Sequence, residues 1–307
     1  MADKNIFICS DGHRLAYNIW MPSQNTKIKA FVQILHGMAE YSDRYEKFAQ
    51  YLNKRGFAVF AADHRGHGGT ADKDELGWFA ESDGWNRIAS DAVELADFVT
   101  SRYSGLDIFL FGHSMGSFLA RTVMVQNPDF YSGVIIMGTA ASKGLIGKIG
   151  KLICKGEIKK HGQKGPGTKM NNLSFGSYNK TFEPSVTSFD WLSRDSKEVD
   201  KYVNDPLCGF LCTNGFFYDM LCGIEIANSR KLSSSLPKDL PILVISGDND
   251  PVGNMGKDIK KVYSQYKSAG IKDVSMILVP GARHELLNET NKTETYKTLS
   301  TWLESHL

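Results

Sequence analysis

Residues 107–116 read DIFLFGHSMG, an apolar run that ends in a GxSxG pentapeptide centred on Ser114. The run 107–111 predicts a buried strand, and the apolar spacing over 114–127 predicts a helix directly after it. Small residues beside a serine let neighbouring backbone approach a sharp strand-to-helix turn, which exposes the hydroxyl. We therefore interpret Ser114 as a candidate nucleophile, and an ordinary glycine-rich turn is the alternative.

The chain on both sides of this turn alternates strands with helices. Continuous apolar runs such as 30–35 are typical of strands buried on both faces, and an amphipathic pattern such as 84–103 is typical of a helix that covers a sheet. The predicted strands are 5–9, 14–20, 30–35, 57–62, 107–111, 133–137, 241–246 and 273–279, and the predicted helices are 43–55, 84–103, 114–127, 254–269 and 292–306. This order predicts an α/β fold with a mostly parallel sheet and helices on both of its faces.

The composition excludes several classes of protein. Of 307 residues, 42% are hydrophobic, and 36 Lys and Arg nearly balance 34 Asp and Glu, so we expect no nucleic-acid partner. Five irregularly spaced cysteines favour free thiols over a disulfide framework. The N-terminal sequence lacks a signal-peptide pattern and no apolar run is long enough to span a membrane, so we expect a cytoplasmic location. These features do not indicate an oligomeric state.

A serine hydroxyl needs a base to become a nucleophile, and the base needs an acid to orient it. His284 follows the predicted strand 273–279, and Asp248 and Asp250 follow the predicted strand 241–246. The carboxyl ends of parallel strands meet at one edge of a sheet, so these side chains are expected near Ser114. The chain order Ser, Asp, His is that of α/β hydrolases.

A tetrahedral intermediate also needs hydrogen-bond donors for its oxyanion. The candidates are the amide of Met115, directly after the nucleophile, and the amide of Met38, in the loop after the predicted strand 30–35. A simple strand-to-helix turn is the alternative for that loop. The histidine-rich segment 63–69 could suggest a metal site, but we expect its side chains to brace loop backbone. We therefore expect no metal and no organic cofactor.

Several motifs together resemble the monoglyceride lipase and lysophospholipase branch of the α/β hydrolases: HGMAEYSDRY (36–45), ADHRGHGGT (62–70), GHSMG (112–116), GDNDPVG (247–253) and PGARHELLNE (280–289). The resemblance implies the α/β-hydrolase fold, with Ser114 as nucleophile, His284 as base and Asp250, rather than Asp248, as acid. It also implies the Met38 and Met115 amides as oxyanion donors.

The regular alternation stops between residues 141 and 235, where members of this family carry an inserted cap. The resemblance therefore implies a catalytic core of residues 1–140 and 236–307 with a helical cap of residues 141–235. Eight lysines and one acidic residue, Glu157, lie between 143 and 169. This segment either contacts an anionic lipid surface or is a solvated loop. Aromatic residues farther along the cap either line an acyl tunnel or form the core of the cap.

We expect a serine hydrolase that acts on a small-molecule acyl ester of the monoacylglycerol or lysophospholipid type. A short-chain carboxylesterase or a thioesterase is the alternative within enzymes. A peptidase is less favoured because the cap is mostly basic, whereas a substrate amino group calls for acidic residues. A non-catalytic binding protein with a hydrolase fold is the alternative from another class, although such proteins usually lack a triad residue.

Overall fold

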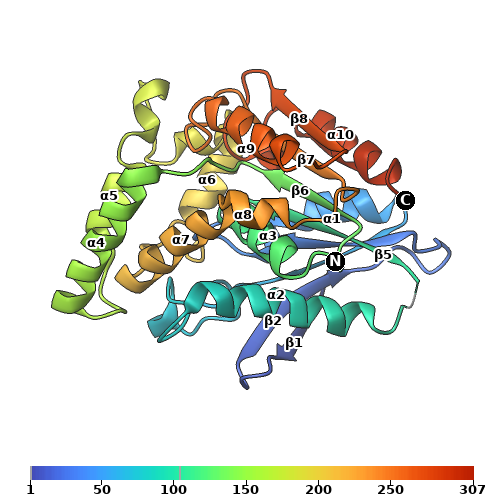
Figure 1. Cartoon of the computed structure of the whole chain (residues 1–307), viewed down its shortest axis with the longest axis horizontal. Coiled ribbons are helices and arrows are strands. Elements are labelled where there is room, and N and C mark those ends of the chain that lie inside the picture. The colour runs from blue at the N-terminus through green and yellow to red at the C-terminus, as the bar shows by residue number, and fades with distance from the viewer. Residues whose placement is uncertain (1, 104) are drawn as a thin grey trace.

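The computed structural model describes residues 2–103 and 105–307, and its centre is a sheet of eight strands within those residues (Figure 1). Only β1 and β2 run antiparallel to their neighbours; β4, β3, β5, β6, β7 and β8 are mutually parallel. The strands lie in the order β1 (Asp3–Ile8), β2 (Arg14–Trp20), β4 (Phe57–Ala62), β3 (Ala30–Leu35), β5 (Asp107–His113), β6 (Gly133–Met137), β7 (Ile242–Gly247) and β8 (Val274–Val279). This is the predicted mostly parallel sheet.

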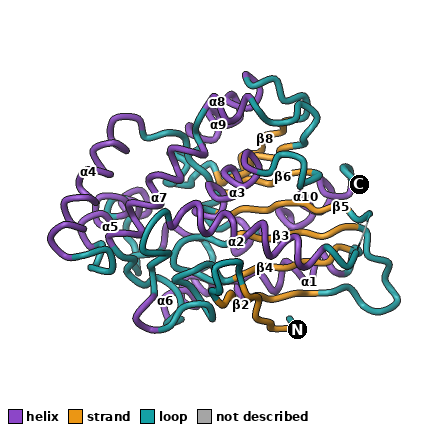
Figure 2. The backbone as a smooth tube through the Cα atoms, turned by 60° about the horizontal axis from the view of Figure 1, so that its bottom comes forward, coloured by secondary structure: helices purple, strands orange, loops and turns teal. Residues whose placement is uncertain are grey.

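Helices cover both faces of the sheet because the strands are apolar on both sides. Val32 and Ile34 of β3 pack toward helices α1 (Glu46–Asn53) and α10 (Lys292–Glu304). Phe31 and Leu35 of the same strand belong to the other core. That second core includes residues of α2 (Gly84–Thr100), α3 (Met115–Gln126) and α9 (Lys257–Ser268). Figure 2 shows the course of these helices beside the strands.

The predicted elements agree with the observed ones apart from their ends. The strands 14–20, 30–35, 57–62 and 133–137 have the predicted bounds. The predicted helix 43–55 begins as a 3-10 turn, η1 (Ser42–Tyr45), before α1. The predicted helix 84–103 ends at Thr100, because the amide of Tyr103 bonds the Thr100 carbonyl and tightens the chain.

The chain leaves the sheet after β6 and returns at β7, and the described segment between them is helical. Its elements are α4 (Gly144–His161), α5 (Thr168–Phe175), η3 (Tyr178–Phe182), η4 (Asp190–Leu192), α6 (Ser196–Asn204), α7 (Asn214–Ala227) and α8 (Arg230–Ser234). Phe216 and Phe217 of α7 are fully buried in the core that α2 and α3 share. Helices α4 and α5 form the outer left edge of the molecule in Figure 1.

The lysine-rich segment 143–169 corrects one of our two expectations, because it is not a solvated loop. Most of it is helix α4, whose buried residues Gly150 and Cys154 lie on one face. A Cβ on Gly150 would lie 3.1 Å from the side chain of Leu221, so this face packs against α7. Apolar residues at helical spacing between the lysines explain the helix. No helix in the described residues is long and apolar enough to cross a membrane.

Helix α7 is joined to α2 by a buried carboxyl group. A Cβ on Gly84, the first residue of α2, would lie 2.3 Å from Oδ2 of Asp219, so only glycine permits this approach. Burial raises the pKa of Asp219 to about 7, the negative charge of Asp83 adds to the rise, and the Gly84 amide opposes it. The folded protein therefore binds a proton at Asp219 more tightly than the unfolded chain does.

We predict that Asp219→Asn makes the protein more stable than the wild type at neutral pH. Because the pKa of Asp219 is raised from 3.8 to about 7, its contribution is complete at low pH and is lost as pH rises through that window. The asparagine variant carries no such loss. Thermal melts should show the variant equal to the wild type near pH 4 and more stable near pH 8, by up to about 4 kcal/mol.

The matched control is Asp239→Asn, an exposed carboxylate paired with Lys272. Its melts should follow the wild type at every pH. Parallel wild-type and Asp219→Asn curves across this window would contradict the prediction.

Candidate active site

Ser114 lies in a strained turn between β5 and α3. Its φ and ψ are 54° and −118°, a region that residues other than glycine rarely adopt, and its amide donates to the carbonyl of Met137 at 3.0 Å. A Cβ on Gly116 would lie 2.0 Å from the carbonyl oxygen of Leu35, and one on Gly112 would lie 2.2 Å from that of Gly116. Both glycines of the pentapeptide are therefore required sterically, as the elbow interpretation expects.

His284 and Asp250 form a buried, hydrogen-bonded pair. Nδ1 of His284 donates to Oδ2 of Asp250 at 3.0 Å, and Asp250 also accepts from Oγ of Ser246 and the amide of Val252, each at 2.9 Å. Burial opposes the charge of Asp250, but the charge of His284 and these hydrogen bonds outweigh it and lower the pKa of Asp250. Burial likewise opposes protonation of His284, but the charge of Asp250 outweighs it and raises the pKa of His284.

Asp248, the other aspartate considered from the sequence, has a different partner. Its Oδ1 accepts a hydrogen bond from the amide of Gly281 at 2.7 Å. It therefore braces the loop that carries His284, while Asp250 contacts the imidazole itself.

One cavity of about 850 Å³ is bordered by Ser114, His284, Met38 and Met115. Nε2 of His284 is buried and has no hydrogen-bond partner among the described residues. The structure thus brings four predicted site residues to a single cavity, with Asp250 hydrogen-bonded behind His284. His284 therefore has one nitrogen held by a carboxylate and the other without a partner from residues 2–103 or 105–307, in a cavity that Ser114 also borders.

The loop after β3 is held against Ser114. A Cβ on Gly37 would lie 3.2 Å from the Cβ of Ser114, and the next residue, Met38, borders the cavity. Oε1 of Glu40 accepts from the Gly37 amide at 2.6 Å, and Ala39 between them has a φ of 51°. The buried Glu40 carboxylate thereby fixes a tight turn, which holds the backbone around Met38 in one conformation.

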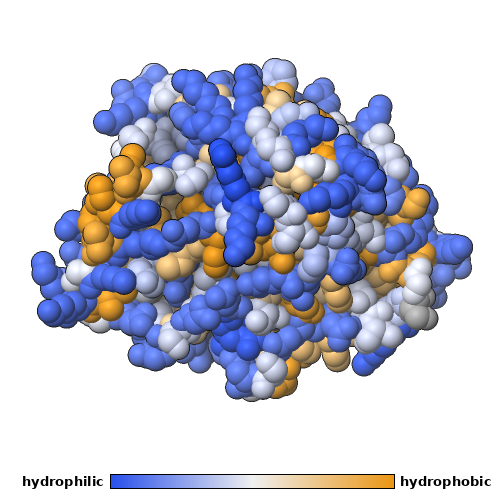
Figure 3. Space-filling view, viewed as in Figure 1, coloured by the Kyte–Doolittle hydropathy of each residue, from blue (hydrophilic) through white to orange (hydrophobic). Residues whose placement is uncertain are grey.

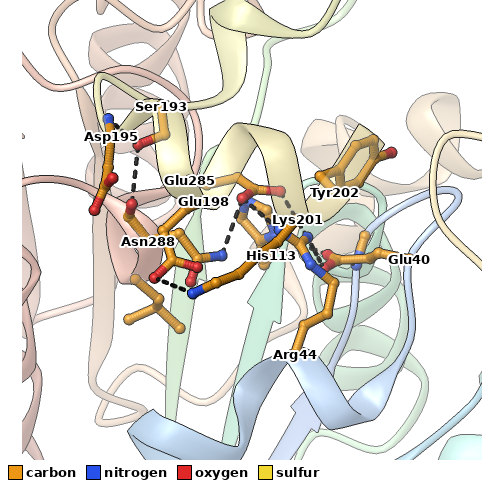
Figure 4. A network of polar contacts seen from close by, with 12 residues as sticks. Glu40, Arg44, His113, Ser193, Asp195, Glu198, Lys201, Tyr202, Glu285 and Asn288 are labelled. Atoms are coloured by element: carbon orange, nitrogen blue, oxygen red, sulfur yellow. Dashed lines mark hydrogen bonds and ion pairs between the residues drawn. The ribbon is translucent and has the colours of Figure 1, made fainter. Parts of the chain in front are cut away.

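Glu40 belongs to a buried ionic network that joins three loops (Figure 4). Nη1 of Arg44 lies 2.6 Å from Oε2 of Glu40, and the Arg44 guanidinium makes two 2.7 Å hydrogen bonds to Glu285, the residue after His284. Nδ1 of His113 lies 3.1 Å from Oε1 of Glu40. Burial opposes the charge of Glu40, but Arg44 and His113 outweigh it and hold its pKa well below the usual range.

The segment 63–69 meets the expectation only in part, because His67 contacts the carbonyl of Arg65 whereas Arg65 pairs with the carboxylates of Asp91 and Asp11. Nε2 of His36 accepts from the amide of His64 at 2.9 Å, and the two rings lie 4.0 Å apart. His67 packs among aromatic side chains, and burial lowers its pKa to about 3. In the described part of the chain, no three His, Cys, Asp or Glu side chains are grouped to hold a metal ion.

Several residues at the site were missed from the sequence. Glu40 and Arg44 lie within a quoted motif, and their spacing of four residues was the only local signal for an ion pair. Glu285 offers no signal, because its partner Arg44 lies far away in the chain. Trp191 was not missed, because it is one of the cap aromatics expected either to line an acyl tunnel or to form the core of the cap; it borders the cavity, and its ring centroid lies 5.2 Å from that of His284.

Known proteins resemble this chain over nearly its whole length. Residues 26–291 match the family described as "Serine aminopeptidase, S33". Human monoglyceride lipase is 28% identical over 91% of this chain and 82% of that protein. The monoacylglycerol lipase of Mycolicibacterium smegmatis is 26% identical over 96% and 95%.

Solved structures agree with the fold. A thermostable carboxyl esterase from Bacillus coagulans has a TM-score of 0.90 at 29% identity and covers 99% of this chain and 98% of its own. A lipase in its open form has a TM-score of 0.88 at 24% identity, which supports the fold alone. The chain therefore belongs to the serine aminopeptidase S33 family and is an ester-hydrolysing α/β hydrolase of the monoglyceride lipase type.

Proposed function

We propose that this protein is a serine hydrolase that cleaves esters of the monoacylglycerol type at Ser114. The observation that carries the proposal is the cavity itself, where Ser114 and the unpartnered Nε2 of His284 meet an apolar lining. Ser114 Oγ attacks the ester carbonyl while His284 accepts its proton and Asp250 stabilises the imidazolium. The amides of Met38 and Met115 donate to the oxyanion. His284 then protonates the leaving alkoxide, and water hydrolyses the acyl-enzyme.

The lining of the cavity favours a lipid ester with an uncharged head group. Where α3, α4 and α7 meet, the lining is apolar and suits an acyl chain: Phe118, Ile153, Met220, Leu221 and Ile224. Between residues 171 and 188, beside Leu173 and Phe175, the lining includes neutral polar side chains that suit hydroxyl groups: Asn171, Asn172, Ser174, Tyr178, Asn179 and Ser188. The Bacillus coagulans esterase was solved in complex with glycerol, which is the head group proposed here.

Charged groups in the lining argue against a phosphorylated head group. Among the described lining residues, Lys143 is the only lysine or arginine, and its Nζ lies 3.4 Å from Oδ2 of Asp258. Glu40 and Glu285 are held by Arg44. A lysophospholipid phosphate would meet no free cation there, and a peptide amino group would meet no free carboxylate. A short-chain carboxylesterase or thioesterase remains the second candidate, since it needs the same catalytic groups.

We also propose the division into a catalytic core, residues 1–140 and 236–307, and a cap, residues 141–235. The support is that the cavity borders both parts: Ser114 and His284 come from the first, and Phe175, Trp191 and Phe210 from the second. The cap would enclose the acyl chain and exclude bulk water. The cytoplasmic location expected from the sequence stays a prediction.

A substrate panel tests the proposed substrate class. We predict a higher kcat/KM for long-chain monoacylglycerols than for lysophosphatidylcholines of the same acyl chain, by about tenfold or more, since an unsolvated phosphate costs more than 1.4 kcal/mol. p-Nitrophenyl esters of graded length should improve as the chain fills the apolar lining. A preference for short esters or thioesters would favour the second candidate.

The control for the panel is Ser114→Ala, which should lose both hydrolysis and labelling by a fluorophosphonate probe. Retained labelling would move the nucleophile to another serine. A wild-type protein that neither labels nor hydrolyses any ester would favour a binding protein.

Matched variants of Asp250 and Asp248 test which aspartate is the acid that orients His284. We predict that Asp250→Asn lowers kcat by about 10³–10⁴-fold, because the amide no longer holds the imidazole in the productive tautomer or stabilises its charge. Asp248→Asn keeps an oxygen that accepts from Gly281, so kcat should fall less than about tenfold. Steady-state kinetics on a soluble p-nitrophenyl ester measures both. The reverse ranking would overturn the choice of Asp250.

We further propose that the outer face of the cap docks on an anionic lipid surface. Large apolar side chains of α4 and α5 are exposed there: Leu145 (76%), Ile146 (78%), Ile149 (56%), Leu152 (69%) and Leu173 (62%). Apolar side chains gather at the left edge of the space-filling view, over α4 and α5 (Figure 3). Ile146, Ile149 and Leu173 also border the cavity. Docking this face would therefore bring the cavity mouth to the lipid.

Charge on α4 supports an anionic surface rather than a neutral one. The helix carries five lysines against one acidic residue, Glu157. One of the five, Lys151, pairs with Glu225. Each lysine near such a surface contributes about 1 kcal/mol. The apolar side chains would insert into the lipid, and the lysines would be attracted to its negative charge.

Vesicle flotation tests the docking face. We predict that Leu145→Gln/Leu152→Gln weakens binding to phosphatidylcholine vesicles and to vesicles with added phosphatidylglycerol, because both lose buried apolar area. Lys148→Gln/Lys155→Gln should weaken binding only to the anionic vesicles. Neither leucine borders the cavity, so hydrolysis of a soluble ester should stay unchanged. Val186→Gln, at an exposed apolar residue on another loop, is the control. Equal wild-type binding to neutral and anionic vesicles would remove the charge contribution.

A further inference from the structure

The cap segment around Trp191 runs beside the loop that carries His284. The amide of Glu285 donates to the carbonyl of Leu192 at 2.7 Å. On the other side, Nη1 of Arg283 donates to the carbonyl of Asp190 at 2.5 Å. The two neighbours of His284 therefore bond the two neighbours of Trp191. These two hydrogen bonds, one on each side, hold Trp191 opposite His284.

The indole of Trp191 is itself held from the cap side. Its ring lies 5.2 Å from the His284 ring, at an interplanar angle of 42°. Phe175 stacks on it with an interplanar angle of 13°, and Tyr178 meets it edge-on at 5.0 Å. The backbone amide of Trp191 donates to Oδ1 of Asn179 at 2.9 Å. The indole therefore has little freedom to move away from the imidazole.

We propose that Trp191 is a positioning residue of the cap, which holds the imidazole of His284 in place and stabilises its protonated form. The inference rests on the proposed function, in which His284 becomes an imidazolium during each acyl transfer. Tryptophan is the side chain that best stabilises a cation within about 6 Å of its ring. The effect is largest in a dry site, and both rings are buried.

Other charged and titratable groups around His284 also affect its protonation. Asp250 bonds its Nδ1, while Glu285 and Glu40 act on it through their charges. The ring of His113 lies 4.9 Å away. None of these four groups belongs to the cap; the titratable cap residue nearby is Tyr178, whose pKa is raised by burial and by the charge of Asp250. Trp191 would be the aromatic contact that the cap makes with the base, in addition to lining the cavity.

The test compares the wild type with Trp191→Phe and Trp191→Leu on a soluble p-nitrophenyl ester, with kcat/KM measured across pH. The acidic limb of that profile reports the base of the free enzyme. Losing the indole destabilises the imidazolium, so the limb should move to lower pH. We expect about one unit and about a tenfold fall in kcat for the leucine variant, and about half that shift for phenylalanine. KM should stay within about twofold.

The matched control is Trp302→Phe, because Trp302 also lies on a histidine, with ring centroids 4.3 Å apart from His306, away from the cavity. Its pH profile and kcat should equal those of the wild type. Thermal melts establish which variants fold, and the phenylalanine variant alone suffices if the leucine variant does not. An unchanged acidic limb in Trp191→Phe, or a change confined to KM, would overturn the proposal.

Ser114→Ala distinguishes a failure of the proposed function from a failure of the role proposed for Trp191. If that variant still hydrolyses esters, the proposed function fails whatever the Trp191 variants do. If it is inactive while the Trp191 variants keep the wild-type limb and kcat, only the role of Trp191 fails.

Discussion

The close packing of α3 against β3 is the constraint on which the site depends. Any side chain at Gly116 would collide with the carbonyl oxygens of Leu35 and His36, which lie 2.0 Å and 2.6 Å from the position of its Cβ. Because β3 ends at Leu35, this contact also sets the distance between Ser114 and the loop that begins at His36. The strained backbone of Ser114 costs about 1–3 kcal/mol, and fully buried strands on either side of β5 over-determine it. Ser114 and the loop that begins at His36 therefore share one rigid support.

Buried charges then tie together loops that the strands only bring near one another. A carboxylate such as Glu40 or Glu285 would cost several kcal/mol if it were buried without a partner. Arg44 neutralises both, so the loop after β3 and the loop after β8 must fold together. Asp250 and His284 impose the same requirement on the loops after β7 and β8. Each pair adds little to the net free energy of folding, but it restricts the loops around the cavity to a single arrangement.

The sequence predicted the parts of the site that follow from strand ends and missed those that depend on distant partners. Ser114 and His284 could be found because parallel strands deliver their carboxyl ends to one edge. The choice of Asp250 over Asp248 needed the family resemblance, since both follow the same strand; the geometry pairs Asp250 with His284. Glu285 could not be found, because nothing local to it indicates Arg44. Helix α4 was not predicted, because its many lysines interrupt the apolar residues that face α7, and their helical spacing is recognisable only in the folded structure.

Within the segment 141–235, α7 packs in the core that α2 and α3 share, whereas residues 189–209 and the exposed face of α4 differ in what they contact. Residues 189–209 contact the loops after β3 and β8: the amide of Gly209 and the hydroxyl of Tyr202 both donate to the carbonyl of Ala39, and the carbonyl of Leu192 accepts from the amide of Glu285. These contacts require fixed backbone positions and tolerate little change. The exposed face of α4 takes part in none of these hydrogen bonds, so its apolar area and its charge can vary without moving the loop that carries His284. Phe175, the last residue of α5, stacks on Trp191, and it is through α5 that a change on the outer helices would reach the ring beside His284.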